Sequence, residues 1–190
     1  MSWDPYLHLE SGVLRNRLGI GDRAELARVE AALTGSRILD LGHQELPGAY
    51  DLDHLRAFHL YILGDVYDWA GELRTVSIGK GVPFCLPQHL RSAGDVLFAQ
   101  LARDDHLRGL ARPDFVDALA WLLSEINALH PFREGNGRTQ RAFLGQLAHA
   151  AGHGVRWAAM DPAENAEASR DAHLGDRTRL RAMLNRLVMR

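Results

Sequence analysis

The amino-acid sequence predicts an all-α protein that carries one small β-hairpin. Apolar residues recur at helical spacing through most of the chain, and helix-capping residues precede several of these stretches. Residues 74–86 break the helical pattern. The chain of 190 residues is 46% hydrophobic and 24% charged, which is ordinary for a globular protein with a sizeable core. It contains no repeat, linker or low-complexity tract, so we expect a single domain over residues 1–190.

The first expected helix covers about residues 22–33. Asp22 is a good N-cap, and Leu26, Val29 and Leu33 recur on one face of the helix. We therefore expect these three leucine and valine side chains to form its buried stripe.

The other helices are predicted from the same two features, a capping residue and apolar residues at helical spacing. The second starts at Asp51 and keeps helical spacing as far as Trp69. Asp114 follows Pro113 and is expected to cap the fourth. The remaining helices are expected over residues 88–103, residues 140–151 up to Gly152, and two short segments from Asp161 to about Val188 with a break near Gly175.

The one β-prone segment reads as a hairpin, which we call the flap, over about residues 74–86. Residues 74–78 favour a strand, residues 79–81 can turn, and residues 82–85 are extended. The alternative is an ordinary surface connection between helices.

The bulk properties exclude several classes of function. The formal net charge of −2 gives no electrostatic reason to bind nucleic acid. No apolar run approaches the length of a membrane span, and the first residues lack the pattern of a signal peptide. Cys85 is the only cysteine, so no internal disulfide is possible. We expect a cytoplasmic protein with neither nucleic acid nor membrane as a direct partner.

Residues 130–141, His-Pro-Phe-Arg-Glu-Gly-Asn-Gly-Arg-Thr-Gln-Arg, are the most informative stretch of the chain. A glycine-rich loop that opens a helix presents free backbone N–H groups to an anion. Arg138 and Arg141 are three residues apart and are expected on the same side of that helix. The stretch therefore predicts a phosphate-binding site, with Arg138 and Arg141 as permanently charged donors.

His130 and Glu134 add reactive groups to this site. A neutral imidazole accepts a proton near physiological pH, so His130 is a candidate general base. The alternative for His130 is a histidine placed favourably at a helix C-terminus. Glu134 offers hard oxygen ligands suited to Mg²⁺, and its alternative is an acid that stabilises a helix N-terminus.

The other residues of the loop have expected roles in shape and binding. Gly135 and Gly137 allow conformations and close approaches that a Cβ would block. The side-chain amide of Asn136 is expected to donate to a phosphate oxygen. We expect Phe132 to point inward as an anchor and Arg133 to be a solvated surface residue.

The 130–141 stretch matches the Fic signature at each defining position, and the chain is identified as a member of the Fic family of bacterial toxins. Residues 13–20 are similar to the N-terminal segment of these proteins, and residues 65–74 are similar to their lead-in to the flap. Residues 167–170, followed by Gly175, resemble their C-terminal helices. The resemblance implies a Fic fold over nearly the whole chain.

The resemblance also implies a protein adenylyltransferase that uses ATP and Mg²⁺. His130 would deprotonate a Tyr, Ser or Thr hydroxyl of a target protein, and that hydroxyl would attack the α-phosphate of ATP. Glu134 would hold Mg²⁺. Asn136 and the loop N–H groups, including those of Gly135 and Gly137, would hold the α-phosphate. Arg138 and Arg141 would hold the β- and γ-phosphates.

The flap and the partners follow from the same resemblance. Lys80 and Gly81 would touch the nucleotide. The target would dock by strand addition on the segment made of Thr75, Val76, Ser77 and Ile78. Similar bacterial Fic toxins modify type II topoisomerase subunits, so gyrase B or topoisomerase IV is the implied target.

Inhibition of Fic proteins implies a further partner. The inhibitory helix of the family carries Ser/Thr-x-x-x-Glu, and its glutamate pairs with the second motif arginine, here Arg141. No serine or threonine of this chain is followed four residues later by glutamate. The resemblance therefore implies a toxin restrained by a small antitoxin supplied in trans.

Two other functions remain open from the sequence. One is a Fic-fold enzyme with different phosphotransfer chemistry, although the kinase branch called Doc departs from the Gly-Asn-Gly-Arg found at residues 135–138. The other is a non-catalytic interaction module on the same helical scaffold.

Overall fold

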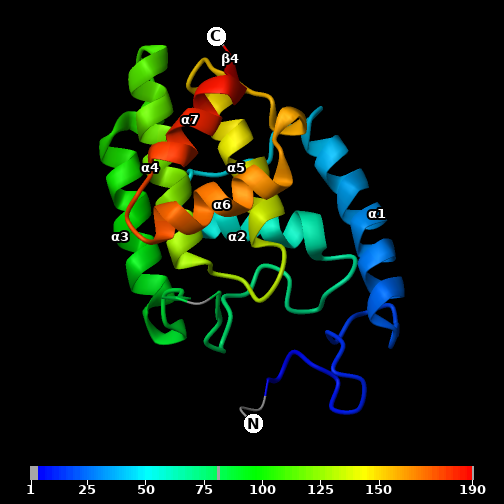
Figure 1. Ribbon diagram of the computed structural model, residues 1–190. Helices are drawn as coiled ribbons and strands as arrows, with labels where there is room; N and C mark the ends of the chain where they lie inside the picture. The colour runs from blue at the N-terminus through cyan, green and yellow to red at the C-terminus, as the bar shows by residue number, and fades with distance from the viewer. Residues whose placement is uncertain (1–3, 81, 190) are drawn as a thin grey trace.

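The computed structural model describes residues 4–80 and 82–189, and it confirms a predominantly helical protein (Figure 1). The helices in chain order are α1 (Arg23–Leu41), α2 (Leu52–Leu63), α3 (Leu90–Arg103), α4 (Arg112–Leu129), α5 (Asn136–Ala150), α6 (Pro162–His173) and α7 (Thr178–Leu187). Three short 3₁₀ helices are η1 (Pro87–His89), η2 (Asp105–Leu107) and η3 (Trp157–Ala159).

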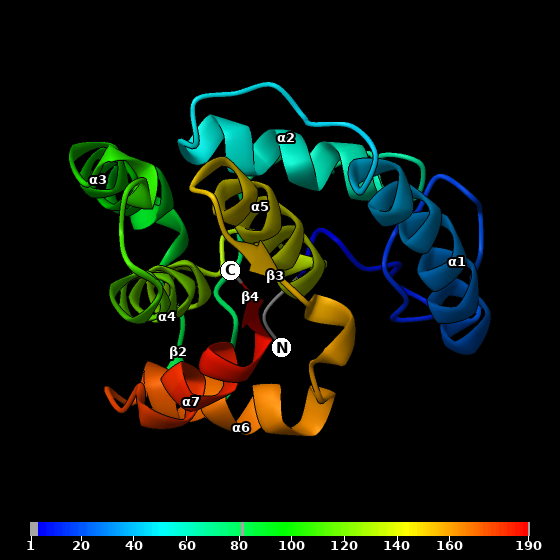
Figure 2. The ribbon, with the colours of Figure 1, turned by 90° about the horizontal axis from the view of Figure 1, so that it is seen from above.

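Helix α5 lies in the middle of the protein, and the other elements pack around it. It contacts α2, α4 and β3 (Gly154–Val155), while α6 and α7 pack on each other and on α4. Figure 2 shows α5 between α2 on one side and the layer of α6 and α7 on the other. The main core joins these helices through fully buried side chains such as Phe58, Leu119, Phe143 and Leu184. The start of α5, which carries the second half of the 130–141 stretch, is therefore fixed on several sides.

Helix α1 differs from the expectation in length and in its buried face. Asp22 caps it as predicted, but the helix continues to Leu41 along the edge of the molecule (Figure 1). The expected face is only partly right: Leu26 is buried and Val29 and Leu33 are half-buried, but the other buried residues are Glu30 and Thr34. A polar side of α1 is buried because Glu30 and Thr34 bind Arg138 of α5.

The boundaries of three other helices shift for local reasons. Helix α2 ends at Leu63, before Gly64, so Trp69 lies in the turns that follow it. Asp114 is not the cap of α4, because that helix begins at Arg112 with Pro113 in its first turn. Helix α5 begins at Asn136, inside the glycine-rich stretch and earlier than expected. The two C-terminal helices and the break between them are as predicted.

The flap is a hairpin, but its strands lie further along than predicted. Strand β1 (Gly79–Lys80) pairs antiparallel with β2 (Val82–Pro83), and Gly81 lies outside the described residues. Residues 75–78 form no strand, contrary to our expectation. The first two of them are bound outside the hairpin: the Thr75 N–H donates to the Tyr6 hydroxyl at 3.1 Å, and the Val76 carbonyl accepts from Arg74.

A second strand pair was not predicted. Strand β3 pairs antiparallel with β4 (Val188–Met189), next to the end of the described chain. Two-residue strands give too little alternation to be found in a sequence. Within the described ranges, no helix combines the length and the apolar character needed to cross a membrane.

Candidate active site

A cavity of about 810 Å³ opens where the flap, the loop after α4, the start of α5 and α6 come together. This volume is in the range of small-molecule sites. The predicted site residues that line it are His130, Glu134, Asn136, Gly137, Arg141 and Ile78. Five others do not line it: Gly135, Arg138, Thr75, Val76 and Ser77. The side chain of Lys80 and the whole of Gly81 lie outside the described part of the chain.

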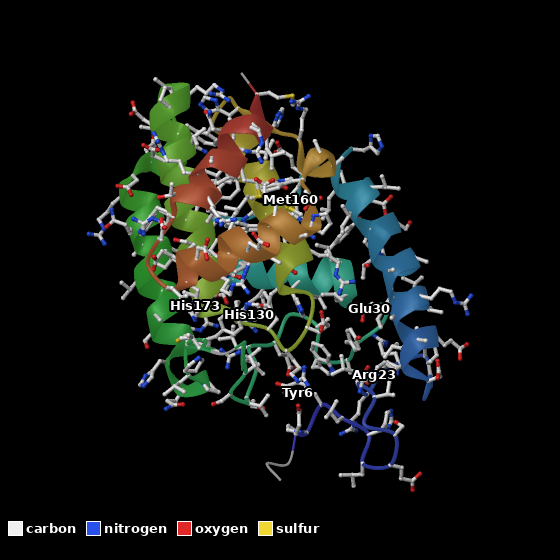
Figure 3. The ribbon with its side chains drawn as sticks, in the orientation of Figure 1. Tyr6, Arg23, Glu30, His130, Met160 and His173 are labelled. Atoms are coloured by element: carbon white, nitrogen blue, oxygen red, sulfur yellow. The ribbon has the colours of Figure 1, made fainter. Side chains whose placement is uncertain are left out.

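His130 is the C-terminal cap residue of α4, and it lines the cavity. Its backbone is left-handed, with φ 44° and ψ 60°, and its N–H donates to the Ile126 carbonyl at 3.0 Å. The imidazole stacks on the Phe84 ring of the flap, with 3.9 Å between ring centroids and 7° between planes. Figure 3 shows His130 below α6, on the same side as His173. The flap thus fixes the plane of the candidate base.

Arg74 joins the flap to the loop that carries His130. Its side chain is almost completely buried, and its Nε donates to the His130 carbonyl at 2.8 Å. The guanidinium also donates to the carbonyls of Val76, at 2.7 Å, and of Cys85. One buried cation therefore holds both ends of the flap and the backbone of the candidate base. Burial lowers the pKa of Arg74 from its ordinary value.

His59 of α2 packs against the loop that joins α4 to α5 and binds its backbone. The Gly71 N–H donates to His59 Nδ1 at 2.7 Å, so the proton of the neutral ring is assigned to Nε2, which donates to the Glu134 carbonyl at 3.0 Å. The ring stacks on Phe132, with 3.8 Å between centroids and 14° between planes. Phe132 is buried and anchors the loop as predicted.

Because His59 is buried as a neutral ring, the loop is expected to be sensitive to acid. Desolvation is the main cause that lowers the pKa of His59 from 6.5 to about 4. His59 binds a proton less readily in the folded state than in the unfolded state. The contribution of the neutral ring to the unfolding free energy is therefore fully present above about pH 6.5. It is lost as the pH falls from about 6.5 towards 4, at a total cost of about 3 kcal/mol in unfolding free energy.

Urea unfolding at several pH values measures this loss. His59→Gln has no ring to titrate, so the difference in unfolding free energy between wild type and variant should shrink as the pH falls from about 6.5 to 4. His43→Gln is a control, because His43 is exposed. A wild-type pH dependence that His59→Gln leaves unchanged would contradict the assignment.

Asn136 and Gly135 shape the loop. The side-chain Oδ1 of Asn136 accepts from the Phe132 N–H at 3.0 Å, and its Nδ2 donates to the Phe132 carbonyl at 2.7 Å. The amide expected to face a phosphate is therefore engaged in closing the loop. Gly135 has φ 78°, and a Cβ there would lie 2.2 Å from Leu63 Cδ1, so this position requires glycine.

Arg141 is a half-buried cation without an anionic partner among the described residues. In residues 4–80 and 82–189, no hydrogen bond or ion pair engages its guanidinium, which lines the cavity. Burial, and secondly the charge of Arg138, lower the pKa of Arg141 from its ordinary value. An uncompensated cation in a cavity is costly in the empty protein and favours an anionic ligand. A Cβ at Gly137 would lie only 3.2 Å from the Arg141 Nη1, so glycine leaves room for this guanidinium.

The other two arginines of the stretch are already paired. Arg138 forms an ion pair with Glu30 of α1 and donates to the Thr34 hydroxyl at 3.1 Å. The structure therefore brings only Arg141 of the two predicted phosphate ligands into the cavity. Arg133, expected to be solvated, forms a half-buried ion pair with Asp4 at 2.8 Å, so that prediction is wrong.

Glu134 is suitable for a metal that arrives with its substrate. Its carboxylate lines the cavity and is half-exposed, and its Oε1 accepts from the Gly135 N–H at 2.9 Å. The described residues contain no cluster of three or more His, Cys, Asp or Glu side chains that could hold a metal ion alone. Mg²⁺ is commonly held by one or two carboxylates together with substrate phosphates, and a single Glu134 fits that mode.

Sequence reasoning missed several residues of the site. His59 follows Leu55 and precedes Ile62 at helical spacing, so its place on the buried face of α2 was readable. Arg74 and Glu30 gave no signal, because their partners are distant in the sequence. In the α6 wall of the cavity, Ser169 and Arg170 belong to a segment recognised only as similar to the family, and His173 was not identified at all.

Comparison with known proteins gives consistent results for family and fold. Residues 49–148 match the Fic/DOC family. Protein adenylyltransferase VbhT of Bartonella schoenbuchensis is 42% identical over 184 residues, which are 96% of this chain and 38% of VbhT. The probable protein adenylyltransferase y4lH of Sinorhizobium fredii is 39% identical over 188 residues, which are 97% of this chain and 96% of that relative.

A solved structure confirms the fold. The N-terminal Fic domain of a VirB-translocated Bep effector protein from Bartonella quintana, crystallised with bound ADP, superposes with a TM-score of 0.92. The two chains are 25% identical, and the match covers 97% of this chain and 94% of the other.

Proposed function

Since the chain belongs to the Fic/DOC family and relatives over most of its length are named protein adenylyltransferases, we propose that it transfers AMP from ATP to a hydroxyl group of a target protein. The observation that carries the proposal is the cavity, in which the unpaired Arg141 guanidinium and the His130 imidazole face the same space. The first attracts the phosphates of a nucleotide, and the second can accept the proton of an attacking hydroxyl. The ADP-bound relative supports a nucleotide as the ligand.

The reaction follows from where these groups lie. The target hydroxyl gives its proton to His130 as its oxygen bonds to the α-phosphorus of ATP. The bond between the α-phosphorus and the oxygen that bridges to the β-phosphate breaks, and pyrophosphate leaves with the electron pair. Arg141 neutralises charge on the terminal phosphates, and the backbone N–H groups at the start of α5 face the phosphate chain. Asn136 contributes by closing the loop on Phe132.

Glu134 is the residue proposed to hold Mg²⁺ beside the nucleotide. When bound, the ion supplies positive charge that offsets the negative charge on the phosphates. The chain contributes the orientation of Glu134, which the Gly135 N–H and the His59 contact to its carbonyl both restrain.

The position of the transferred label tests the proposed function. Lysate incubated with the protein and α-³²P-ATP should yield a labelled target, whereas γ-³²P-ATP should leave none, because the γ-phosphate departs with pyrophosphate. Label from γ alone would indicate a kinase on the same fold. Absence of label from both would support a non-catalytic interaction module.

We also propose that the target docks by strand addition along the outer edge of the flap. Because the Ile78 carbonyl accepts from the Phe84 N–H, Ile78 faces inward in the hairpin, and its neighbours Ser77 and Gly79 face outward. An added strand would then use the N–H of Ser77. Ser77→Pro removes this donor and should lower target labelling about tenfold while leaving AMPPNP binding unchanged.

The matched control is Ser77→Ala, which keeps the backbone donor and removes the side chain. It should label the target like wild type. Docking through the backbone is contradicted if Ser77→Pro labels as well as Ser77→Ala, or if Ser77→Ala loses as much activity as the proline variant.

We further propose a toxin that acts in the cytoplasm on a type II topoisomerase subunit and is restrained by an antitoxin in trans. The support is that Arg141 has no carboxylate partner among the described residues and that the chain lacks the inhibitory sequence. Cells that express the wild-type chain alone should stop growing, and a small protein encoded beside it should restore growth. Equal growth of wild-type and His130→Ala cells would contradict the toxin role.

A further inference from the structure

Helix α1 contributes a buried carboxylate to the edge of the site. The Glu30 side chain is 12% exposed and forms an ion pair with Arg138 of α5. Figure 3 places Glu30 on the side of α1 that is turned towards the rest of the protein. Its Oε1 accepts from Arg138 Nη2, and its Oε2 accepts from the Tyr67 hydroxyl. Both carboxylate oxygens are therefore engaged.

Thr34 and Tyr67 complete this arrangement. The Thr34 hydroxyl donates to the Glu30 backbone carbonyl at 2.7 Å and accepts from Arg138 Nη1 at 3.1 Å. Tyr67 is buried, and burial followed by its bond to Glu30 raises the pKa of its hydroxyl. The hydroxyl therefore stays protonated and donates a hydrogen bond to Glu30. Arg138 is thus held by two residues of α1, one turn apart.

A second carboxylate lies close to the same guanidinium. Glu134 Oε1 is 3.6 Å from Arg138 Nη2, beyond the length of a good hydrogen bond. Glu134 and Arg138 are four residues apart, with the acid on the N-terminal side, which is the favourable order for such a pair. Arg138 therefore lies between two acids and is hydrogen-bonded to only one of them.

We propose that Glu30 is a positioning residue that keeps Arg138 from forming a direct hydrogen bond with Glu134. Among the described residues, Arg138 forms ion pairs with these two acids alone. If the charge of Glu30 is removed, the arginine keeps its charge and is partly buried, so it needs another carboxylate. Glu134 is the one within reach, and pairing with Arg138 would withdraw it from the cavity. The inference rests on the proposed role of Glu134 in holding Mg²⁺.

The Mg²⁺ dependence of nucleotide binding tests this role. Calorimetry measures the affinity of the protein for AMPPNP, an ATP analogue, over a range of Mg²⁺ concentrations. Glu30→Gln keeps the shape of the side chain and removes its charge. We expect the Mg²⁺ concentration needed for half of the full gain in affinity to rise about tenfold, the effect of losing one charge-assisted contact, with AMPPNP affinity in EDTA unchanged.

Two further comparisons separate positioning from general damage. Thr34→Val removes one bond to Arg138 but leaves the Glu30 charge, so its Mg²⁺ midpoint should stay near that of wild type. In an Arg138→Gln background, Glu30→Gln should cause no further shift, because the residue that competes for Glu134 is gone. If Glu30→Gln does not fold, Tyr67→Phe loosens Glu30 more gently and should shift the midpoint in the same direction.

The possible results distinguish this inference from the proposed function. An unchanged Mg²⁺ midpoint in folded Glu30→Gln, or in Tyr67→Phe where Glu30→Gln does not fold, would overturn the positioning role, even if the variant melts at a lower temperature. An equal shift in the Arg138→Gln background would also overturn it. Wild-type AMPPNP binding that does not depend on Mg²⁺ would instead contradict the proposed role of Glu134, and the inference with it.

Discussion

We expect His130→Ala to lower the rate of AMP transfer by about two to four orders of magnitude, the usual effect of removing a general base. The imidazole stacks on Phe84 at the end of α4, whereas the groups proposed to face the phosphates belong to the start of α5 and to Arg141. AMPPNP affinity, measured by calorimetry, should therefore remain within a factor of a few of wild type.

Single-turnover labelling from α-³²P-ATP measures the loss. His43→Ala removes an exposed histidine and serves as the matched control, with wild-type activity expected. Transfer at more than about a tenth of the wild-type rate in His130→Ala would remove this residue from the mechanism.

Arg141→Gln should produce the second largest effect. The variant removes a half-buried cavity cation for which the described residues provide no anionic partner, so kcat/KM for ATP should fall about 10- to 100-fold, mostly through a higher KM. The nucleotide-free variant should melt at the same temperature as wild type or higher, because a costly unpaired charge has been removed. Replacing a residue with a merely structural role would be expected to lower both kcat/KM and the melting temperature.

The control for Arg141 is Arg179→Gln on α7. Arg179 is exposed and pairs with Glu167 and Asp171, so its loss should change neither KM nor the melting temperature by much. A KM for ATP in Arg141→Gln that equals that of wild type would show that the phosphates are held elsewhere.

The helical part of the fold could be predicted because its signals are local. Asp22, Asp51 and Asp161 each precede a helix, and in the structure each side chain accepts from a backbone N–H of the first turn. The position of the flap strands could not be predicted in the same way. The backbone groups of Thr75 and Val76 are bound by Tyr6 and Arg74 outside the hairpin, and neither contact has a signature in the sequence.

The candidate site was predictable where its residues are contiguous. His130, Glu134 and Arg141 all reach the cavity from one stretch of sequence, as the spacing indicated. Arg138 does not, because its partner Glu30 lies on another helix, and its pairing is a property of the assembled fold. A buried polar face on α1 reads from the sequence as a solvated one, since helical periodicity counts apolar residues only.

Tandem mass spectrometry of the labelled target band tests most directly whether this protein transfers AMP to a protein hydroxyl. The account predicts a Tyr, Ser or Thr side chain that carries AMP after incubation with the wild-type protein and ATP, and the same peptide unmodified after incubation with His130→Ala. A peptide that carries phosphate in place of AMP, or AMP that appears equally with His130→Ala, would contradict it.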